Sequence, residues 1–139
     1  MPDLQFFAEI DSFMAEFVSQ AEAFAPNIAG QVLEEIIDTG PYWSGRSKAS
    51  WVTSVGEPVF YVAGDVAKKA NALSAEDAKQ RSMATLANIQ GAPLGQTLII
   101  ANGNPYIDAI NSGHSPGYEG WIDAAVNKYI GLINVDVFF

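Results

Sequence analysis

The sequence predicts one α+β domain, in which helices and a few short strands share a single core, and three patterns support this class. Apolar residues recur at helical spacing through the first 37 residues. Apolar and polar residues alternate over 51–55, as in a strand with one buried face. A capping motif begins another helix near residue 75. The chain has 139 residues, the length of one ordinary domain, so we expect a single domain over 1–139.

The first predicted element is a long helix with an apolar face. Its apolar residues are spaced alternately three and four apart, which places them in one stripe along the helix. The stripe consists of Phe7, Ile10, Met14, Phe17, Ala21, Phe24 and Ile28, and it is widened by Phe6, Phe13 and Val18. Pro26 lacks a backbone N–H, so we expect a kink or break near 22–26 and a second helical piece that ends at Gly40-Pro41. The stripe packs either on the chain's own sheet or, in part, on a neighbouring subunit.

The middle of the chain is predicted to hold two strands and one helix. Residues 51–55 alternate as a strand, and 59–63 form a second, weaker strand. Ser74 followed by Asp77 has the form of a capping box, a hydroxyl with an acid three residues later. A helix is therefore predicted from about 75 to 90.

The last third is predicted to hold a strand, two helices and a final apolar segment. Residues 98–101 form a buried strand, and an Asn-Gly-Asn-Pro turn leads into a short helix over 105–112. Gly113 is suited to a left-handed cap. Apolar residues at helical spacing predict a helix over 121–132. Residues 133–139 alternate apolar and polar, and either pair as a last strand or act as an interaction tail.

The composition excludes several classes of protein. Sixteen acids and seven bases give a net charge of −9, eight of the acids precede residue 40, and Arg46 is the first cation. Such a surface repels phosphates, so tight binding of DNA or RNA is not expected. The chain has no cysteine, which removes disulfides, thiolate nucleophiles and Cys-zinc sites. No run approaches about 18 apolar residues, and the N-terminus has no positive export signal, so we expect synthesis in the cytoplasm and no membrane.

The stretch 97–115 brings together several reactive residue types, but their spacing does not fit a reaction centre. His114 is the only histidine, which excludes a site with two histidine ligands. Ser112, Ser115 and Asp108 are close in sequence, yet neither serine lies in a G-x-S-x-G elbow. We expect His114 to bind nearby backbone, and we expect no catalytic residue, no metal and no cofactor.

Carboxylates and glycines also give no strong site. The adjacent pair Glu34 and Glu35 points to different sides of a helix. Asp108 and Asp123 could approach in space, which the sequence does not decide. The turn at 101–105 follows a strand and precedes a helix, but it lacks both the G-x-G-x-x-G pattern and the Walker lysine. Turn chemistry explains it fully.

Two segments resemble a known protein family. Residues 40–51, GPYWSGRSKASW, are similar to a stretch reading threonine-proline-x-aspartate-threonine-glycine-arginine-x-x-x-serine-tryptophan. Residues 100–114 are similar to a stretch with asparagine-x-x-proline-tyrosine, a short helix and glycine-histidine-serine. The chain thus resembles the small tail-completion, or head–tail joining (neck), proteins of tailed bacteriophages and prophages over most of its length, with 57–95 as a variable insertion. Trp43-Ser44 replaces the acid–threonine pair of the family.

This resemblance implies a virion structural subunit without enzymatic activity. It implies a long N-terminal helix, which Pro26 predicts to be kinked, against a small antiparallel sheet, with two or three further helices. It also implies a ring, commonly of six subunits or a multiple, at the head–tail junction, where portal or connector and tail proteins are the partners. DNA would pass through the lumen without specific binding. An acidic protein-binding module that forms no ring, or a small hydrolase that uses His114, are the alternatives.

The ring hypothesis predicts which residues face neighbouring subunits. They belong to one face of the first helix and to the loops 41–47 and 102–120. The candidate interface residues are Trp43, Arg46, Lys48, Trp51, Asn104, Tyr106, His114 and Trp121. Arg46 and Lys48 are rare cations in an acidic chain, so each is expected to pair across a subunit boundary. The alternative for Arg46 is a surface cation without a partner.

Overall fold

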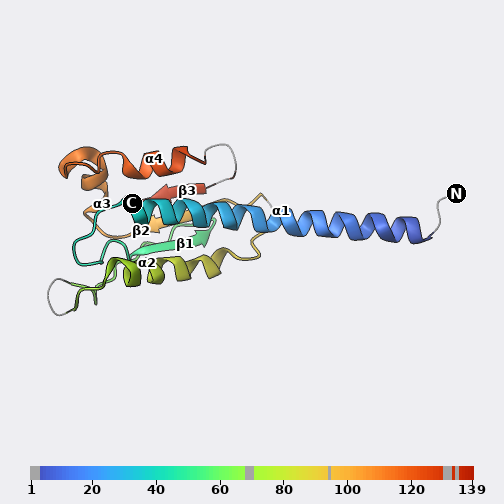
Figure 1. Cartoon of the computed structure of the whole chain (residues 1–139), viewed down its shortest axis with the longest axis horizontal. Coiled ribbons are helices and arrows are strands. Elements are labelled where there is room, and N and C mark those ends of the chain that lie inside the picture. The colour runs from blue at the N-terminus through green and yellow to red at the C-terminus, as the bar shows by residue number, and fades with distance from the viewer. Residues whose placement is uncertain (1–3, 68–70, 94, 130–132, 134) are drawn as a thin grey trace.

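The computed structural model describes residues 4–67, 71–93, 95–129, 133 and 135–139. It has the predicted α+β class, with a long N-terminal helix, further helices and a small sheet (Figure 1). In chain order the elements are α1 (Leu4–Thr39), β1 (Trp51–Val55), α2 (Ala75–Ala84), the 3₁₀ helix η2 (Thr85–Ile89), β2 (Leu98–Asn102), α3 (Ile107–Ala109), the π-helical turn η3 (Ile110–His114), α4 (Trp121–Asn127) and β3 (Val135–Phe138).

The helix α1 is a single helix of 36 residues, so the predicted break near residues 22–26 is wrong. Pro26 lies inside the helix and is buried. Proline removes one backbone hydrogen bond and crowds the turn before it. Here the proline lies where the helix enters the core, and the buried residues that follow, from Ile28 to Ile37, hold the helical geometry by tertiary contacts.

The two halves of α1 have different surroundings. Every residue over 4–20 is exposed, whereas the buried residues of the helix begin at Pro26. Figure 1 shows the first half projecting beyond every other element, with its N-terminal end far from the sheet. We call residues 4–24 the stalk and the remainder of the described chain the body.

The sheet has three strands in the order β1-β2-β3. β1 and β2 are antiparallel, with Trp51 opposite Asn102, but β2 and β3 are parallel, with Leu98 opposite Val135. The expectation of an antiparallel sheet therefore holds for one pair and is wrong for the other. The chain between β2 and β3 is long and helical, and such a crossover brings the next strand back in the same direction. Of the two alternatives for residues 133–139, the structure adopts the strand.

The predicted second strand over 59–63 is wrong. These residues are extended but do not join the sheet. Gly103 N, just after β2, donates to Tyr61 O at 2.9 Å, and Ala63 N donates to Ser50 Oγ, just before β1, at 2.9 Å. Hydroxyl groups of α2 and η2 occupy the free edge of β1 instead. Thr53 N donates to Thr85 Oγ1 at 3.0 Å, and Thr53 Oγ1 donates to Thr85 O at 2.6 Å. This edge is thereby closed to a further strand.

The remaining helices follow the sequence prediction with shorter bounds. Ser74 caps α2 by accepting from Asp77 N at 3.0 Å, and the predicted helix continues as α2 and then η2 to Ile89. The short helix begins at Ile107, and Gly113 has the predicted left-handed conformation, with φ of 103°. α4 begins where predicted, and part of its expected range, 130–132, lies outside the described residues.

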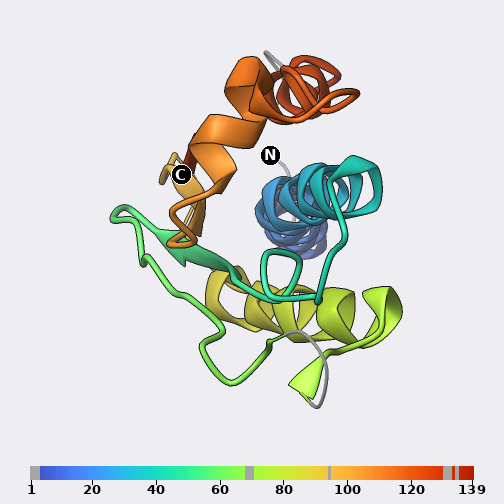
Figure 2. The same ribbon diagram turned by 90° about the vertical axis from the view of Figure 1, so that its left-hand side faces the viewer.

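The core surrounds the second half of α1. Figure 2 looks along this helix, with α2 on one side of it, α4 on the other and the sheet beside it. The principal core cluster is made of Ile28, Val32, Leu33, Ile36, Ile37, Trp51, Ile100, Ile107, Trp121, Ile122 and Ala125. The body is therefore built around one half of a helix whose other half is in solvent.

Candidate assembly surfaces

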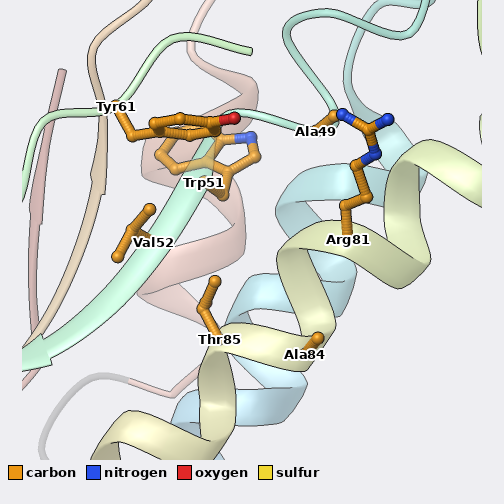
Figure 3. Close-up of a pocket in the computed structure, with 7 residues that line it drawn as sticks. All are labelled: Ala49, Trp51, Val52, Tyr61, Arg81, Ala84 and Thr85. Atoms are coloured by element: carbon orange, nitrogen blue, oxygen red, sulfur yellow. The ribbon is translucent and has the colours of Figure 1, made fainter.

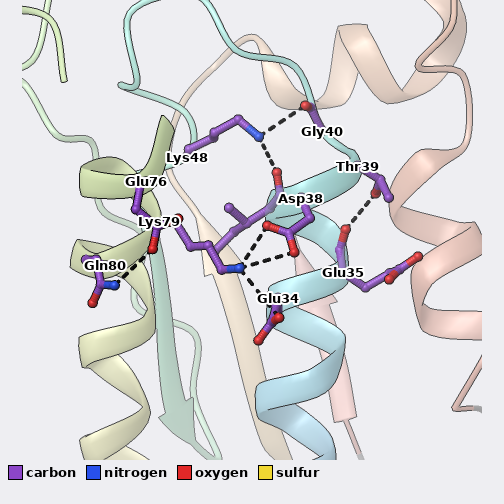
Figure 4. A network of polar contacts seen from close by, with 10 residues as sticks. Glu34, Glu35, Asp38, Thr39, Gly40, Lys48, Glu76, Lys79 and Gln80 are labelled. Atoms are coloured by element: carbon purple, nitrogen blue, oxygen red, sulfur yellow. Dashed lines mark hydrogen bonds and ion pairs between the residues drawn. The ribbon is translucent and has the colours of Figure 1, made fainter. Parts of the chain in front are cut away.

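The C-terminal end of α1 is held by side chains from distant parts of the chain. Lys48 Nζ donates to the carbonyls of Ile37 and, at 3.2 Å, of Gly40 (Figure 4). Trp121 Nε1 donates to the Ile36 carbonyl at 3.1 Å. These bonds satisfy carbonyls that have no partner within a helix, and a cation is favoured at this end of the helix dipole. Burial lowers the pKa of Lys48 below its ordinary value, and the nearby Asp38 carboxylate partly offsets this.

Glycine is required at position 40 because two groups approach it closely. A Cβ added to Gly40 would lie 2.8 Å from the Ile36 carbonyl oxygen and 2.8 Å from Trp121 Nε1. The predicted Gly40 cap is therefore part of the same arrangement that holds Lys48 and Trp121. Both of these candidate interface residues are buried within their own chain, at 7% exposure each.

Two more of the predicted interface residues organise loops inside the body. Trp51 is 2% exposed and belongs to the principal core. Asn104 is buried, and its Oδ1 accepts from Tyr106 N at 3.1 Å while its own N–H donates to Asn102 Oδ1 at 2.8 Å. Asn102 in turn donates to the Ser47 carbonyl at 2.9 Å. This hydrogen bond joins the segments 40–51 and 100–114, which resemble neck proteins in sequence. The asparagines thus shape the turn, as turn chemistry predicts.

Arg46 is half-buried and binds backbone of its own chain. Its Nε donates to the Val66 carbonyl at 2.8 Å, and its Nη2 lies 3.5 Å from the Gly64 carbonyl. The guanidinium therefore fastens the loop after residues 59–63 to the turn before β1. The sequence predicted for Arg46 either an ion pair across a subunit boundary or a surface position without a partner. Neither alternative included hydrogen bonds to backbone carbonyls of the same chain.

Three of the predicted interface residues are on the surface. Trp43 is 76% exposed and Tyr106 is 61% exposed. His114 is also exposed, and its Nδ1 lies 2.9 Å from the Ala109 carbonyl oxygen, as expected for a loop histidine that binds backbone. Among the described residues, no group of three ligating side chains could hold a metal ion. No described helix is long and apolar enough to cross a membrane.

Ion pairs join α1 to the elements on either side of it. Lys79 on α2 lies 3.0 Å from Asp38 and 3.5 Å from Glu34, and its hydrogen bond to Asp38 raises the pKa of the amine (Figure 4). Lys128, just after α4, binds Glu35, which raises the pKa of that amine. These pairs fasten α2 and α4 to the body half of α1. The stalk, by contrast, contains four carboxylates and no lysine or arginine.

The stalk exposes a continuous apolar stripe. The exposed fractions of its large apolar side chains range from 38% at Val18 to 88% at Leu4. The set consists of Leu4, Phe6, Phe7, Ile10, Phe13, Met14, Phe17, Val18 and Phe24. Together they expose roughly 1,000 Å² of apolar side chain, taking about 200 Å² for a fully exposed large side chain. Monomeric proteins rarely expose one apolar patch beyond a few hundred Å².

A second apolar surface is the segment Val59-Phe60-Tyr61-Val62, which we call the apolar segment. All four side chains are exposed, by 37% to 58%. Its backbone lies directly on Gly103, where an added Cβ would lie 2.8 Å from Tyr61 N and 3.0 Å from Tyr61 O. The segment is thus held by its backbone, while its side chains remain accessible.

A hollow of about 460 Å³ lies beside the apolar segment (Figure 3). β1 and Ala49 form one wall, Tyr61 lies over Trp51, and the helical side is formed by Arg81, Ala84 and Thr85. Asp65 accepts two hydrogen bonds from Arg81, at 2.9 and 3.1 Å, and this holds the pKa of the carboxyl below its ordinary value. The hollow is therefore mainly apolar, and the arginine at its rim is paired with Asp65.

Comparisons of the chain with protein-family models, curated proteins and solved structures gave no match.

Neither the apolar segment as a surface nor Gly103 as the residue that admits its backbone was predicted from the sequence. A signal was present, because four consecutive apolar residues cannot alternate between core and solvent as a half-buried strand requires. Buried Asn111 was also missed. Its Oδ1 accepts from Ile122 N at 3.1 Å and its carbonyl accepts from Gly120 N at 2.8 Å, which fixes the start of α4. No pattern in the sequence identifies that role.

Proposed function

We propose that this protein is a ring-forming structural subunit of the neck of a tailed bacteriophage, a tail-completion or head–tail joining protein between portal or connector and tail. The observation that carries the proposal is the stalk, an apolar helical face that its own chain leaves in solvent. A face of this size and aromatic content is suited to contacts between subunits.

The sequence supports the same function through the two segments that resemble neck proteins, 40–51 and 100–114. In the body these segments are joined by the Asn102–Ser47 hydrogen bond, beside the sheet. The loops they form carry Trp43, Tyr106 and His114, which are exposed and would face lateral neighbours. Lys48, Trp51, Asn104 and Trp121 would act indirectly, by fixing the shape of those loops.

Charge supports a channel through which DNA passes. The net charge of −9 gives a field that repels phosphate, so DNA would not be retained by the lumen. In this proposal acidic residues face the channel and apolar side chains face neighbouring subunits. The subunit would work through these contacts, without a reaction centre or a cofactor.

A second candidate is an acidic module that binds another protein without forming a ring, and the exposed stripe of the stalk is the observation that favours it. The hydrolase alternative has less support, because the hydrogen bond found for His114 goes to a backbone carbonyl and not to a serine or a carboxylate. Replacing His114 by alanine while assembly is unchanged would dispose of the hydrolase alternative.

The test is the composition and structure of the particle. Tailed particles made by the phage or prophage that encodes this chain would be purified and their necks examined by cryo-EM. The proposal predicts a ring of this chain between the portal and the tail. Particles whose neck lacks the chain would contradict it. A chain recovered as a complex with one other protein, and never as a ring, would support the binding module.

A further inference from the structure

The structure leaves two apolar surfaces uncovered, the stripe of the stalk and the apolar segment of the body. Runs of consecutive exposed apolar residues are unfavourable unless a protein uses them. The stalk cannot cover its own body, because it continues α1 in one direction and would have to break the helix to fold back (Figure 1). Another molecule must therefore cover it.

The arrangement of charges on the stalk resembles the anatomy of an interface. At 100° per residue, the stripe from Phe7 to Phe24 occupies an arc of roughly 140°. Two carboxylates lie along each edge of this arc, Glu9 and Glu16 on one side, Asp11 and Glu22 on the other. An apolar centre with a charged rim is typical of protein–protein contacts.

The acidic rim restricts what can cover the stripe. Two stalks packed together would bring four carboxylates from each chain side by side, with no lysine or arginine in either stalk. A membrane surface is also unfavourable, because helices that lie on membranes carry lysine and arginine on their polar face and anionic lipids repel carboxylates. The rim requires a partner that combines an apolar surface with cations.

The body of a second copy provides both. Ala63 and then the loop 64–66 follow the apolar segment; Arg46 binds two carbonyls of this loop and Arg81 pairs with its Asp65 carboxylate. The side chain of Arg81 is 42% exposed and lies at the rim of the hollow in Figure 3. The stalk exposes more than the roughly 800 Å² per partner of a stable complex, and the apolar segment, with roughly 400 Å², would cover part of it beside the hollow.

We propose that the stalk of one copy packs its apolar stripe across the apolar segment of a neighbouring copy, with its acidic rim beside Arg46 and Arg81. A stalk side chain such as Phe17 would enter the hollow between Trp51 and Thr85 of that neighbour. The contact joins two different surfaces, so it repeats from copy to copy and generates a ring when the rotation closes. This inference rests on the self-assembly in the proposed function and specifies the surfaces that perform it.

Crosslinking tests the pairing directly, because the chain has no cysteine of its own. Phe17→Cys and Phe60→Cys would be prepared as separate proteins; both positions are exposed, by 59% and 58%, so each variant should fold. The two proteins are mixed at the highest soluble concentration and treated with a short bismaleimide. The matched control replaces Phe17→Cys by Ser19→Cys, which lies about 200° around the helix.

The expected result is a covalent dimer in the mixture of Phe17→Cys with Phe60→Cys, at least about tenfold more abundant than in the Ser19 control or in either protein alone. A dominant crosslink between two Phe17→Cys chains would overturn the proposal in favour of paired stalks. No crosslink, or binding of the wild-type chain to phosphatidylcholine vesicles through the stalk, would overturn it in favour of another partner. These readouts concern purified copies, so they are independent of whether the chain is found in a phage neck.

Discussion

The two halves of α1 share one helix and one apolar stripe, but only one half is buried. Ile28, Val32 and Ile36 are below 10% exposed, because the sheet, α2 and α4 surround them. In the stalk, residues with the same spacing are in solvent. The comparison teaches that helical spacing specifies an apolar face, while the rest of the chain decides whether that face has a partner within the same molecule.

The largest expected difference between the two halves is in stability. Ile36→Ala should lower the free energy of unfolding by about 2–5 kcal/mol, because it leaves a cavity in the core. Ile10→Ala, on the same helix, should change it by no more than about 0.5 kcal/mol in the dissociated chain. Their exposed fractions are 1% and 43%. Urea denaturation at low protein concentration measures both, and equal losses would contradict the division into stalk and body.

The next largest effect on stability is expected at Lys48, which binds the C-terminal end of α1. Lys48→Met should lower the free energy of unfolding by about 1–3 kcal/mol, since the carbonyls at the end of α1 lose a buried donor. The control is Lys128→Met, which removes a pair whose lysine side chain is 58% exposed and should cost less than about 1 kcal/mol.

The pH dependence of the Lys48 variant has a definite sign. The folded pKa of Lys48 is lowered, so between that pKa and the ordinary value of 10.5 the unfolded chain binds more protons than the folded chain. The contribution of Lys48 to the free energy of unfolding therefore rises with pH in this window. The difference in free energy of unfolding between wild type and Lys48→Met should be larger near pH 10 than near pH 7. A difference that shrinks as the pH rises would be inconsistent with a buried ammonium.

An effect of similar size is expected where the body holds the apolar segment. Gly103→Ala should cost about 1–3 kcal/mol, because the added methyl group would press on the backbone of Tyr61. Gly64→Ala is the matched control, as a Cβ there meets nothing within 4 Å. If the segment receives a stalk, Gly103→Ala should also weaken self-association, whereas Gly64→Ala should not. Calorimetry and sedimentation together measure these changes.

The sequence predicts the individual helices and strands of this fold better than it predicts how they pack and pair with one another. The capping box at Ser74, the left-handed Gly113 and the buried strand at 98–101 depend on neighbouring residues, and each is found. The parallel pairing of β3 and the absence of a strand at 59–63 depend on how the whole chain is arranged. The unbroken helix at Pro26 also depends on the arrangement of the whole chain, because tertiary contacts offset the local cost of a proline inside a helix.

The candidate interface could be predicted only in part for the same reason. Tryptophan is suited equally to a core and to an interface. Trp51 and Trp121 are in the core and Trp43 is on the surface, yet nothing in their local sequences distinguishes them. The stripe of the stalk was visible as a pattern, but its exposure follows from the length of α1 relative to the sheet, which local patterns do not encode.

The central claim is that the stalk is the surface through which copies of this protein associate, and sedimentation velocity over a range of concentrations tests it most directly. The wild-type chain should sediment as an oligomer of the 14.9 kDa subunit. Phe13→Glu with Phe17→Glu should remain monomeric, while Ser12→Glu with Ser19→Glu, which adds the same charge to the opposite face, should associate as the wild type does. A monomeric wild type, or a stripe variant that associates as strongly as the control, would contradict the account.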